Sequence, residues 1–280
     1  MSGPWRLIQS GTSTGADNMA VDGLLLERVA GSGSSPVLRF YAWHPPAVSI
    51  GYNQSALKEL DLAKCKHQRI DVVTRPSGGR AVLHWNELTY SLLWPDDEPV
   101  LAGGISASSH RIGESLVEGL GLFGVAAELE PGARTRGGSA SSAKGPCFAS
   151  TSRWEVKCGG KKLVGSAQRR IRGGVLQHGS LLLGPEHERL AELMQTSHVL
   201  PHTSTHLSRW IDDIDLVRLK ECLAEGFERI LGVRLQPADL SYEETATAAK
   251  RAHRFSVGPP FGQATADVAD SDIAGTVPGM

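Results

Sequence analysis

The chain has 280 residues, 40% of them hydrophobic and 21% charged, so it is long enough for one large globular domain and is neither disordered nor fibrous. Its 29 lysines and arginines nearly balance 30 acidic residues, which argues against dedicated nucleic-acid binding because that usually requires a basic excess. No apolar run approaches the ~18 residues of a membrane helix, and Met1 to Arg6 lack the basic-then-apolar pattern of an export signal.

The first part of the chain is predicted to combine two helices with several short strands. Apolar spacing predicts a helix over 17–29, followed by a glycine- and serine-rich loop over 31–36. A second helix with one apolar face is predicted over 105–123. Runs of branched and aromatic residues bounded by Pro, Gly or Asn predict strands over 37–43, 47–51, 70–74, 81–84, 88–94 and 125–129.

Residues 131–146 consist almost entirely of Gly, Ser, Ala, Arg and Lys, and we expect a mobile loop there because no apolar face is available for burial. Beyond it, Gly159-Gly160 predicts a hairpin turn between two strands. The remaining predicted elements are strands over 154–158, 161–167 and 175–183, helices over 215–231 and 241–253, and a disordered stretch over 256–280. Strands in two groups with helices between them predict an α+β fold with mixed or antiparallel sheets and helices packed on them.

The four cysteines, Cys65, Cys147, Cys158 and Cys222, form no CxxC pair. This spacing is typical of reduced thiols rather than of a disulfide or zinc framework. We therefore expect a cytoplasmic enzyme that holds no metal.

Residues 75–84 form the first candidate ligand-binding segment. The adjacent Gly78 and Gly79 allow close approach of the backbone to a ligand, and the flanking Arg75 and Arg80 complement a phosphate or carboxylate. A plain glycine turn with solvated arginines is an equal alternative. His84, taken by itself, is more typical of a hydrogen-bonded structural histidine.

A lysine beside a Gly-Ser-Ala run marks the second segment. Lys162, close to Gly165, Ser166 and Ala167, can stabilise negative charge that develops on a substrate. The alternative, which is favoured without further context, is an edge strand protected by charge. Further on, 178–179 (His-Gly) interrupts a predicted strand, which indicates a bulge, a close backbone approach or a local irregularity.

Cys147 lies at the exit of the predicted mobile loop. Nearby lysines in the sequence favour its thiolate form, whereas a buried, inert thiol is the alternative. The predicted hairpin places Lys162 opposite Lys157, so an approach of Lys162 to Cys147 requires the chain before Trp154 to fold back. The other three cysteines fall in strand or helix patterns and are interpreted as structural.

Three segments of the chain resemble the biotin/lipoate protein ligase family. In chain order they are Arg75-x-Ser77-Gly78-Gly79-x-Ala81-Val82-x-His84, the run from Lys162 to Gln168, and His178-Gly179-Ser180. The likeness begins at 18–22 (Asn-Met-Ala-Val-Asp) and covers roughly residues 5–235. Arg80 and the pair Cys147-Phe148 make the chain most similar to the cysteine-dependent octanoyltransferases of lipoate assembly. Two positions depart from the family pattern, Thr74 before the glycine motif and Trp85 after the histidine.

The resemblance implies a catalytic domain over 1–235, with 236–280 adding a short polar helix and a disordered tail. It implies that Cys147 attacks the thioester of octanoyl-acyl carrier protein and that Lys162 favours the thiolate. A lysine of a lipoyl-type domain, such as the glycine-cleavage H protein, would then take the octanoyl group. No cofactor, nucleic acid or membrane is expected to take part. The implied substrate-binding residues are Arg75, Ser77, Gly78, Gly79, Arg80, His84, Gly165, Ser166, Ala167, His178 and Gly179.

Three other activities remain compatible with the resemblance. One is an ATP-dependent lipoate ligase, and the second is an amidotransferase that moves octanoyl between lipoyl domains. The third is a carrier-binding protein without turnover, and the presence of both Cys147 and Lys162 weighs against it, because a binding module needs neither residue.

Overall fold

The computed structural model describes residues 3–31, 34–130, 154–195 and 203–258. The loop predicted over 131–146, Cys147 and most of the predicted C-terminal tail lie outside these ranges. Among the described helices, none is long and apolar enough to cross a membrane.

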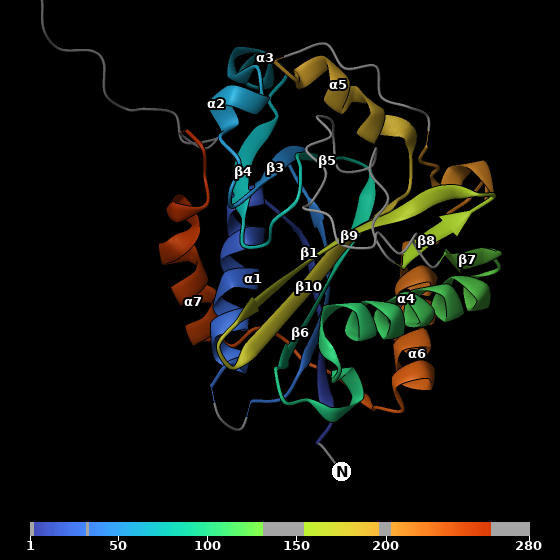
Figure 1. The fold of residues 1–280 in the computed structure, drawn as a ribbon. Helices are drawn as coiled ribbons and strands as arrows, with labels where there is room; N and C mark the ends of the chain where they lie inside the picture. Colours follow the sequence, from blue (N-terminus) through green and yellow to red (C-terminus); the bar gives the residue numbers. More distant parts are fainter. Residues whose placement is uncertain (1–2, 32–33, 131–153, 196–202, 259–280) are drawn as a thin grey trace, which may run out of the picture.

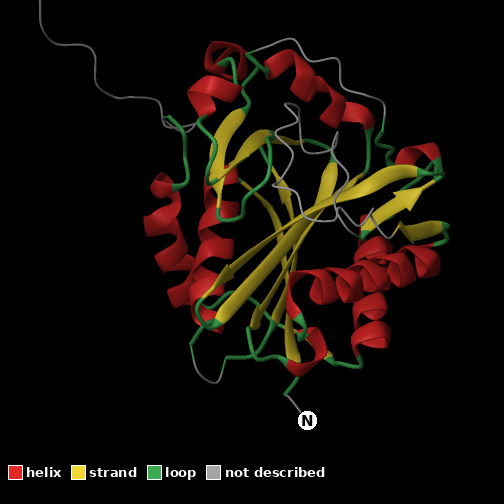
Figure 2. Cartoon of the chain, in the orientation of Figure 1, coloured by secondary structure: helices red, strands yellow, loops and turns green. Residues whose placement is uncertain are grey.

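A large mixed sheet forms the centre of the fold (Figures 1 and 2). Strand β1 pairs in parallel with β2 and β11, and the other neighbours in this sheet are antiparallel. The observed architecture confirms the predicted α+β class with mixed sheets. In spatial order the strands are β11 (Leu235–Pro237), β1 (Trp5–Ser13), β2 (Val37–Trp43), β6 (Glu87–Pro95), β10 (Gly174–Leu182), β9 (Lys161–Ile171), β8 (Glu155–Cys158) and β7 (Ala127–Glu130).

A smaller sheet has the order β4-β3-β5, with β3 parallel to β4 and antiparallel to β5. Short helices cover it, and their apolar side chains, among them Leu60, Cys65 and Leu193, share one core with the strands. The elements are β3 (Ala47–Gly51), β4 (Asp71–Arg75), β5 (Val82–His84), α2 (Ala56–Glu59), α3 (Leu62–His67) and α5 (Leu190–Leu193).

Longer helices cover both faces of the large sheet. Successive side chains of a strand point to opposite faces, and neighbouring residues such as Leu92 and Leu93 accordingly belong to two different cores. Figure 1 shows α1 and α7 on one side of the sheet and α4 and α6 on the other. The bounds are α1 (Gly15–Val29), α4 (Gly104–Phe123), α6 (Leu216–Leu231) and α7 (Tyr242–Arg251).

Side-chain caps set the first residue of several helices. Thr14 accepts a hydrogen bond from the backbone of Asp17 at the start of α1, and Asp215 caps α6. Ser241 and Glu244 form a reciprocal capping box at α7. Such caps satisfy N–H groups that have no partner inside the helix, so the polar residue before each apolar run is a usable start signal.

Strand β9 changes its neighbours along its length. It pairs with β8 from Lys161 to Val164 and with β10 from Val164 to Ile171. From Gly165 onward, no described strand pairs with the other edge of β9.

Strand β10 runs without a break through His178 and Gly179, so a bulge or local irregularity at this point is wrong. The close backbone approach, the third predicted alternative, is confirmed. A Cβ atom at Gly179 would lie 2.6 Å from Ser166 Oγ and 2.8 Å from Gly165 O. Strand β10 therefore keeps its register only with glycine at this position.

Candidate active site

A cavity with about 360 Å³ of empty space lies where the two sheets meet, and we call it the histidine pocket. It brings together seven of the residues predicted for substrate binding, which are Arg75, His84, Gly165, Ser166, Ala167, His178 and Gly179. The other lining residues were not predicted as site residues, although some of them lie in the segments that carry the resemblance. They are Met19, Tyr41, Trp43, Ser49, Val82, Thr89 and Ser180. Segments far apart in the chain thus build one site.

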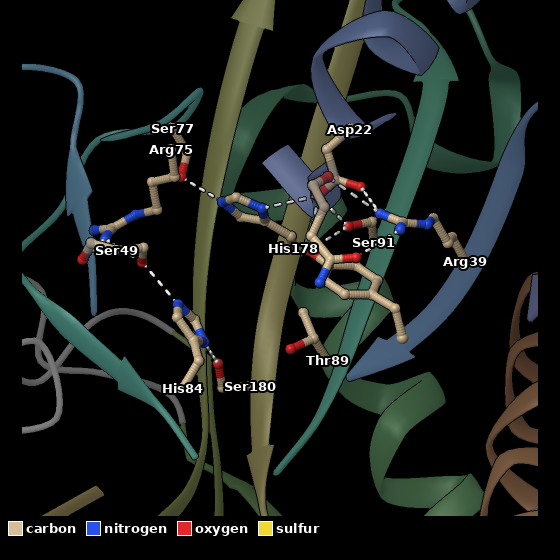
Figure 3. A network of polar contacts seen from close by, with 12 residues as sticks. Asp22, Arg39, Ser49, Arg75, Ser77, His84, Thr89, Ser91, His178 and Ser180 are labelled. Atoms are coloured by element: carbon tan, nitrogen blue, oxygen red, sulfur yellow. Dashed lines mark hydrogen bonds and ion pairs between the residues drawn. The ribbon is translucent and has the colours of Figure 1, made fainter. Parts of the chain in front are cut away.

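His178 lies in a buried chain of three side chains (Figure 3). Its Nδ1 atom is 3.3 Å from Asp22 Oδ2, and its Nε2 atom is 2.5 Å from Ser77 Oγ. Burial lowers the pKa of His178, and the hydrogen bond and charge of Asp22 do not offset this effect. The imidazole is therefore neutral at pH 7. Because Nδ1 faces a carboxylate, Nδ1 carries the proton and Nε2 accepts from the Ser77 hydroxyl.

Asp22, on α1, is the most densely bonded carboxylate of the site. Arg39 Nη1 donates to Oδ1 at 2.8 Å, and the hydroxyls of Tyr41 and Ser91 donate to Oδ2 at 2.9 and 2.6 Å. Burial alone would raise the pKa of Asp22, but the hydrogen bond from His178 and the charge of Arg39 together lower it. The carboxylate is thus held ionised inside the protein.

His84 forms a second chain of the same kind. Its Nε2 atom is 2.7 Å from Ser49 Oγ, and its Nδ1 atom is 2.8 Å from Glu87 Oε1. Trp43 stacks on the imidazole with ring centroids 3.9 Å apart. Among the described residues, none bonds the second carboxylate oxygen, Glu87 Oε2. His84 is therefore held by an acid three residues further along the chain.

Arg75 organises the glycine motif from inside the protein. Its guanidinium donates to the carbonyl oxygens of Gly78, Arg80 and Ser49 at 2.7–3.1 Å. Gly79 has φ +97°, and a Cβ atom there would lie 2.8 Å from Arg75 Nη2, so this position favours glycine. The loop is thus fixed by Arg75.

Four predicted substrate-binding residues of the motif, Ser77, Gly78, Gly79 and Arg80, are not part of the described lining of the histidine pocket. Ser77 is fully buried and reaches the pocket only through His178. The two glycines and the carbonyl of Arg80 instead support Arg75, which does line the pocket.

Lys162 is buried, and its Nζ atom donates to Glu155 Oε1 at 2.8 Å. Its backbone faces Lys157 in the hairpin, as predicted, and also bonds Thr203 and Thr205 on the other side. Lys162 is therefore not a solvated lysine on a sheet edge. Glu155 was missed, because its proximity to Lys162 follows only from the hairpin register.

Two of the other cysteines fit their structural interpretation. Cys65 and Cys158 are both buried. Burial raises the pKa of the Cys65 thiol to about 11 and also raises that of Cys158. Since the thiolate is the nucleophile, neither thiol is activated. Cys147 lies outside the described residues, and its role stays a prediction.

A second, larger cavity, with about 990 Å³ of empty space, lies against helix α4, and we call it the α4 pocket. It shares Ser166 and Ala167 with the histidine pocket. Gln177 and His178 are neighbours on β10; His178 lines the histidine pocket and Gln177 lines the α4 pocket. The two pockets therefore occupy opposite faces of the sheet and meet at β9, where its edge is open.

Comparisons with known proteins agree on one family. Residues 14–228 match the model of the lipoyl protein ligase A/B catalytic domain. The chain is 39% identical over 257 residues to octanoyltransferase LipM of Kyrpidia tusciae, covering 87% of this chain and 93% of the relative.

Solved structures with this fold include a crystal structure of lipoate-protein ligase A bound with ATP, with TM-score 0.75 and 21% identity, covering 90% of this chain and 95% of the other. A bi-partite lipoate protein ligase from Thermoplasma acidophilum, studied with its E2 lipoyl domain, has TM-score 0.73 and 21% identity, covering 90% and 92%. At these identities the two structures show likeness of fold alone.

Proposed function

Because the chain belongs to the lipoyl protein ligase A/B catalytic domain family, we propose that it is an acyltransferase that moves an octanoyl group in lipoate assembly. The proposed donor is octanoyl-acyl carrier protein. The proposed acceptor is a lysine of a lipoyl-type domain such as the glycine-cleavage H protein. This chemistry takes place in the cytoplasm and requires no metal or nucleotide, because the thioester already carries the activation.

The histidine pocket is the observation that carries this proposal. Its lining comes from β9, β10, β6 and β2, which are successive neighbours in the large sheet. Strands lie ~4.8 Å apart, so three steps span roughly 14 Å. An extended eight-carbon chain does not exceed this length. The thioester end would lie at β9, beside the α4 pocket, and the methyl end near Met19 and Trp43.

The polar groups of the histidine pocket are directed toward one another. In both His84 and His178, one ring nitrogen hydrogen-bonds a serine hydroxyl and the other a carboxylate. Trp43 stacks on one face of the His84 ring. A bound chain therefore contacts ring faces and backbone rather than open hydrogen-bonding groups. Such a wall suits a saturated acyl chain, whose binding depends on burial.

The proposed reaction has two acyl transfers. The Cys147 thiolate attacks the carbonyl carbon of the donor thioester, and the carrier thiolate leaves. The acceptor amine then attacks the Cys147 thioester, forms the amide bond, loses a proton and releases the Cys147 thiolate. Two such steps avoid the simultaneous docking of three bodies. The charge of Lys162, which Glu155 orients, would favour the thiolate and the developing oxyanion.

Intact-mass analysis after incubation with octanoyl-acyl carrier protein, without ATP, tests the proposal. The natural chain should gain one octanoyl group, and Cys147→Ala should gain none. Cys222→Ala, a matched thiol-to-methyl control, should be modified like the natural chain. Modification of a lipoyl domain by Cys147→Ala in the presence of ATP and free octanoate would establish the ligase instead. Transfer that starts only from an octanoylated lipoyl domain would establish the amidotransferase.

A further inference from the structure

The α4 pocket has no ligand assigned to it by the proposed function. It is larger than the histidine pocket and meets it at Ser166 and Ala167. From Gly165 onward the outer edge of β9 has no described strand partner. Because Ser166 and Ala167 line both pockets, a ligand whose acyl chain fills the histidine pocket can continue into the α4 pocket at this point of β9.

One wall of the α4 pocket is a connected series of amide and hydroxyl groups. Ser109 Oγ and Gln168 Nε2 both donate to Gln177 Oε1 at 3.0 Å. Gln177 Nε2 donates to Tyr90 Oη at 3.2 Å, and Tyr90 Oη lies 2.9 Å from Ser166 Oγ. An amide has two N–H donors and two acceptor lone pairs. The described hydrogen bonds leave one N–H of Gln177 and one acceptor lone pair of Gln168 for a ligand.

The rest of the lining is mostly apolar, with Ser106 and Glu155, which pairs with Lys162, as its other polar members. Leu116 of α4 and Val156 and Val164 of the hairpin lie in the wall with Trp154. A pocket with a few polar groups in a largely apolar wall fixes the orientation of a ligand by the polar groups and binds it by burial. The matching ligand is a long chain in which amides alternate with methylene or methyl groups.

Polar side chains follow one face of β9. Ser166, Gln168 and Arg170 are separated by even numbers of residues and therefore share a face, with Gln168 ~7 Å and Arg170 ~13 Å beyond Ser166. A register shift between Lys162 and Val164 places Lys162 on the opposite face. Arg170 donates to Gln168 Oε1 at 2.9 Å and to Ser108 Oγ at 3.2 Å. Its guanidinium is partly exposed, so a cation lies at the end of the polar wall that is far from Lys162.

We propose that the α4 pocket binds the phosphopantetheine arm of the donor carrier, with the thioester at Ser166, the two amides along Gln168 and Gln177, and the phosphate at Arg170. This assignment rests on the proposed octanoyl transfer. It explains why the larger and more polar cavity lies directly beside the smaller one. It also gives the carrier a recognition element that a small thioester lacks.

The first experiment compares two donors, octanoyl-4′-phosphopantetheine and the truncated octanoyl-N-acetylcysteamine. Ser109→Met, which narrows the pocket from α4, should lower kcat/KM of enzyme acylation about tenfold for the long donor and less than twofold for the short one. Ala107→Met is the matched control, because Ala107 is a half-buried residue on the same helix outside the described pocket lining. It should affect neither donor.

Equal loss with both donors in Ser109→Met, or no loss with either, would overturn the assignment. Arg170→Gln sharpens the comparison further. It should raise the KM for octanoyl-4′-phosphopantetheine and leave the KM for octanoyl-pantetheine, which lacks the phosphate, unchanged. An equal change for both would remove Arg170 as the phosphate contact.

A binding measurement separates this inference from the proposed function. In Cys147→Ala, free 4′-phosphopantetheine should shift the indole N–H resonance of Trp154, which donates to Ser106 Oγ at 3.0 Å in the pocket wall. The shift should saturate, and Ser109→Met should abolish it. Absence of any shift would refute the assignment of the pocket. A shift in Cys147→Ala, together with a natural chain that forms no octanoyl-enzyme, would support the pocket and refute the transfer.

Discussion

The two histidines of the active site have the same kind of neighbours but differ in how their acids are held. Each imidazole lies between a serine hydroxyl and a carboxylate. Asp22, which faces His178, also bonds a buried arginine and two hydroxyls. Glu87, which faces His84, has one oxygen shared by His84 and Thr89 and one oxygen without a described partner.

This difference indicates that the two hydrogen-bonded series, Asp22–His178–Ser77 and Glu87–His84–Ser49, have different roles in the protein. The carboxylate of Asp22 balances the buried charge of Arg39 and connects α1 to strands β2, β6 and β10. Glu87 lies on β6, close in sequence to the histidine that it holds, and its described hydrogen bonds join only β5 and β6. We therefore expect the Asp22 chain to dominate the stability of the fold and the Glu87 chain to act mainly on the shape of the pocket.

Asp22→Asn should have the largest effect on stability. It leaves Arg39 buried without a balancing charge, which costs about 3–5 kcal/mol of the free energy of unfolding. Urea denaturation measures this loss. Glu27→Gln on the same helix is the control, because the ion pair of Glu27 with Arg251 is at the surface and contributes at most ~1 kcal/mol. Equal losses in the two variants would contradict the structural role of Asp22.

Acyl-chain length tests the feature that both histidine chains share, a wall without open polar groups. Each methylene removed from water contributes ~0.8 kcal/mol, so a hexanoyl donor should bind roughly one order of magnitude more weakly than an octanoyl donor. Decanoyl should be rejected more sharply, because overpacking a closed slot is costly. Initial rates of enzyme acylation measure this profile. A flat response from six to twelve carbons would contradict an enclosed pocket.

Glu87→Gln should be mild, in contrast to Asp22→Asn. The amide carbonyl of the introduced glutamine can still accept from His84 Nδ1, so we expect a loss of about 1 kcal/mol or less of the free energy of unfolding. Urea denaturation, run beside the Asp22 variant, measures the difference. Octanoyl-enzyme formation should persist in this variant. A loss as large as that of Asp22→Asn would show that the two acids have the same role.

The pH dependence of stability should be the smallest signal. Burial holds the pKa of His178 below its ordinary 6.5, so the unfolded chain binds more protons than the folded one once the pH falls below about 6.5. The stability contribution of His178 is therefore complete above that pH and is lost as the pH falls. Urea denaturation between pH 7 and 5 should show this decline, and His178→Gln should reduce its slope. An unchanged slope would assign the decline to other groups.

Local patterns in the sequence predicted most elements of the fold but only part of the site. Strands β2 and β3 were predicted with their observed bounds, because branched and aromatic residues there are bounded by Pro or Gly. Strand β1 was missed because only Trp5 and Ile8 of its nine residues are buried, which leaves no alternating pattern. The family resemblance carried by the glycine, lysine and histidine motifs gave seven of the residues that line the histidine pocket.

The supporting acids, Asp22 and Glu87, were not predicted as site residues. Asp22 is 156 residues from His178 and belongs to the site through tertiary packing alone. A charged residue within the buried face of the predicted helix 17–29 was a usable sign of a buried partner. Glu87 follows His84 by three residues, and its role depends on the turn between β5 and β6. Long-range pairing, rather than local propensity, decides these contacts.

The dependence of the site on β10 has a consequence for synthesis of the chain. At ~5–20 residues per second, the ribosome adds the 156 residues between Asp22 and His178 in roughly 8–30 s. In the later part of that time, after β6 ends at Pro95 and before β10 begins at Gly174, β6 has β2 on one side but lacks β10 on the other, so the nascent sheet ends in an unpaired strand. Open strand edges recruit other chains. Protection of the nascent β6 edge is therefore as much a requirement for a working enzyme as the chemistry of the finished pocket.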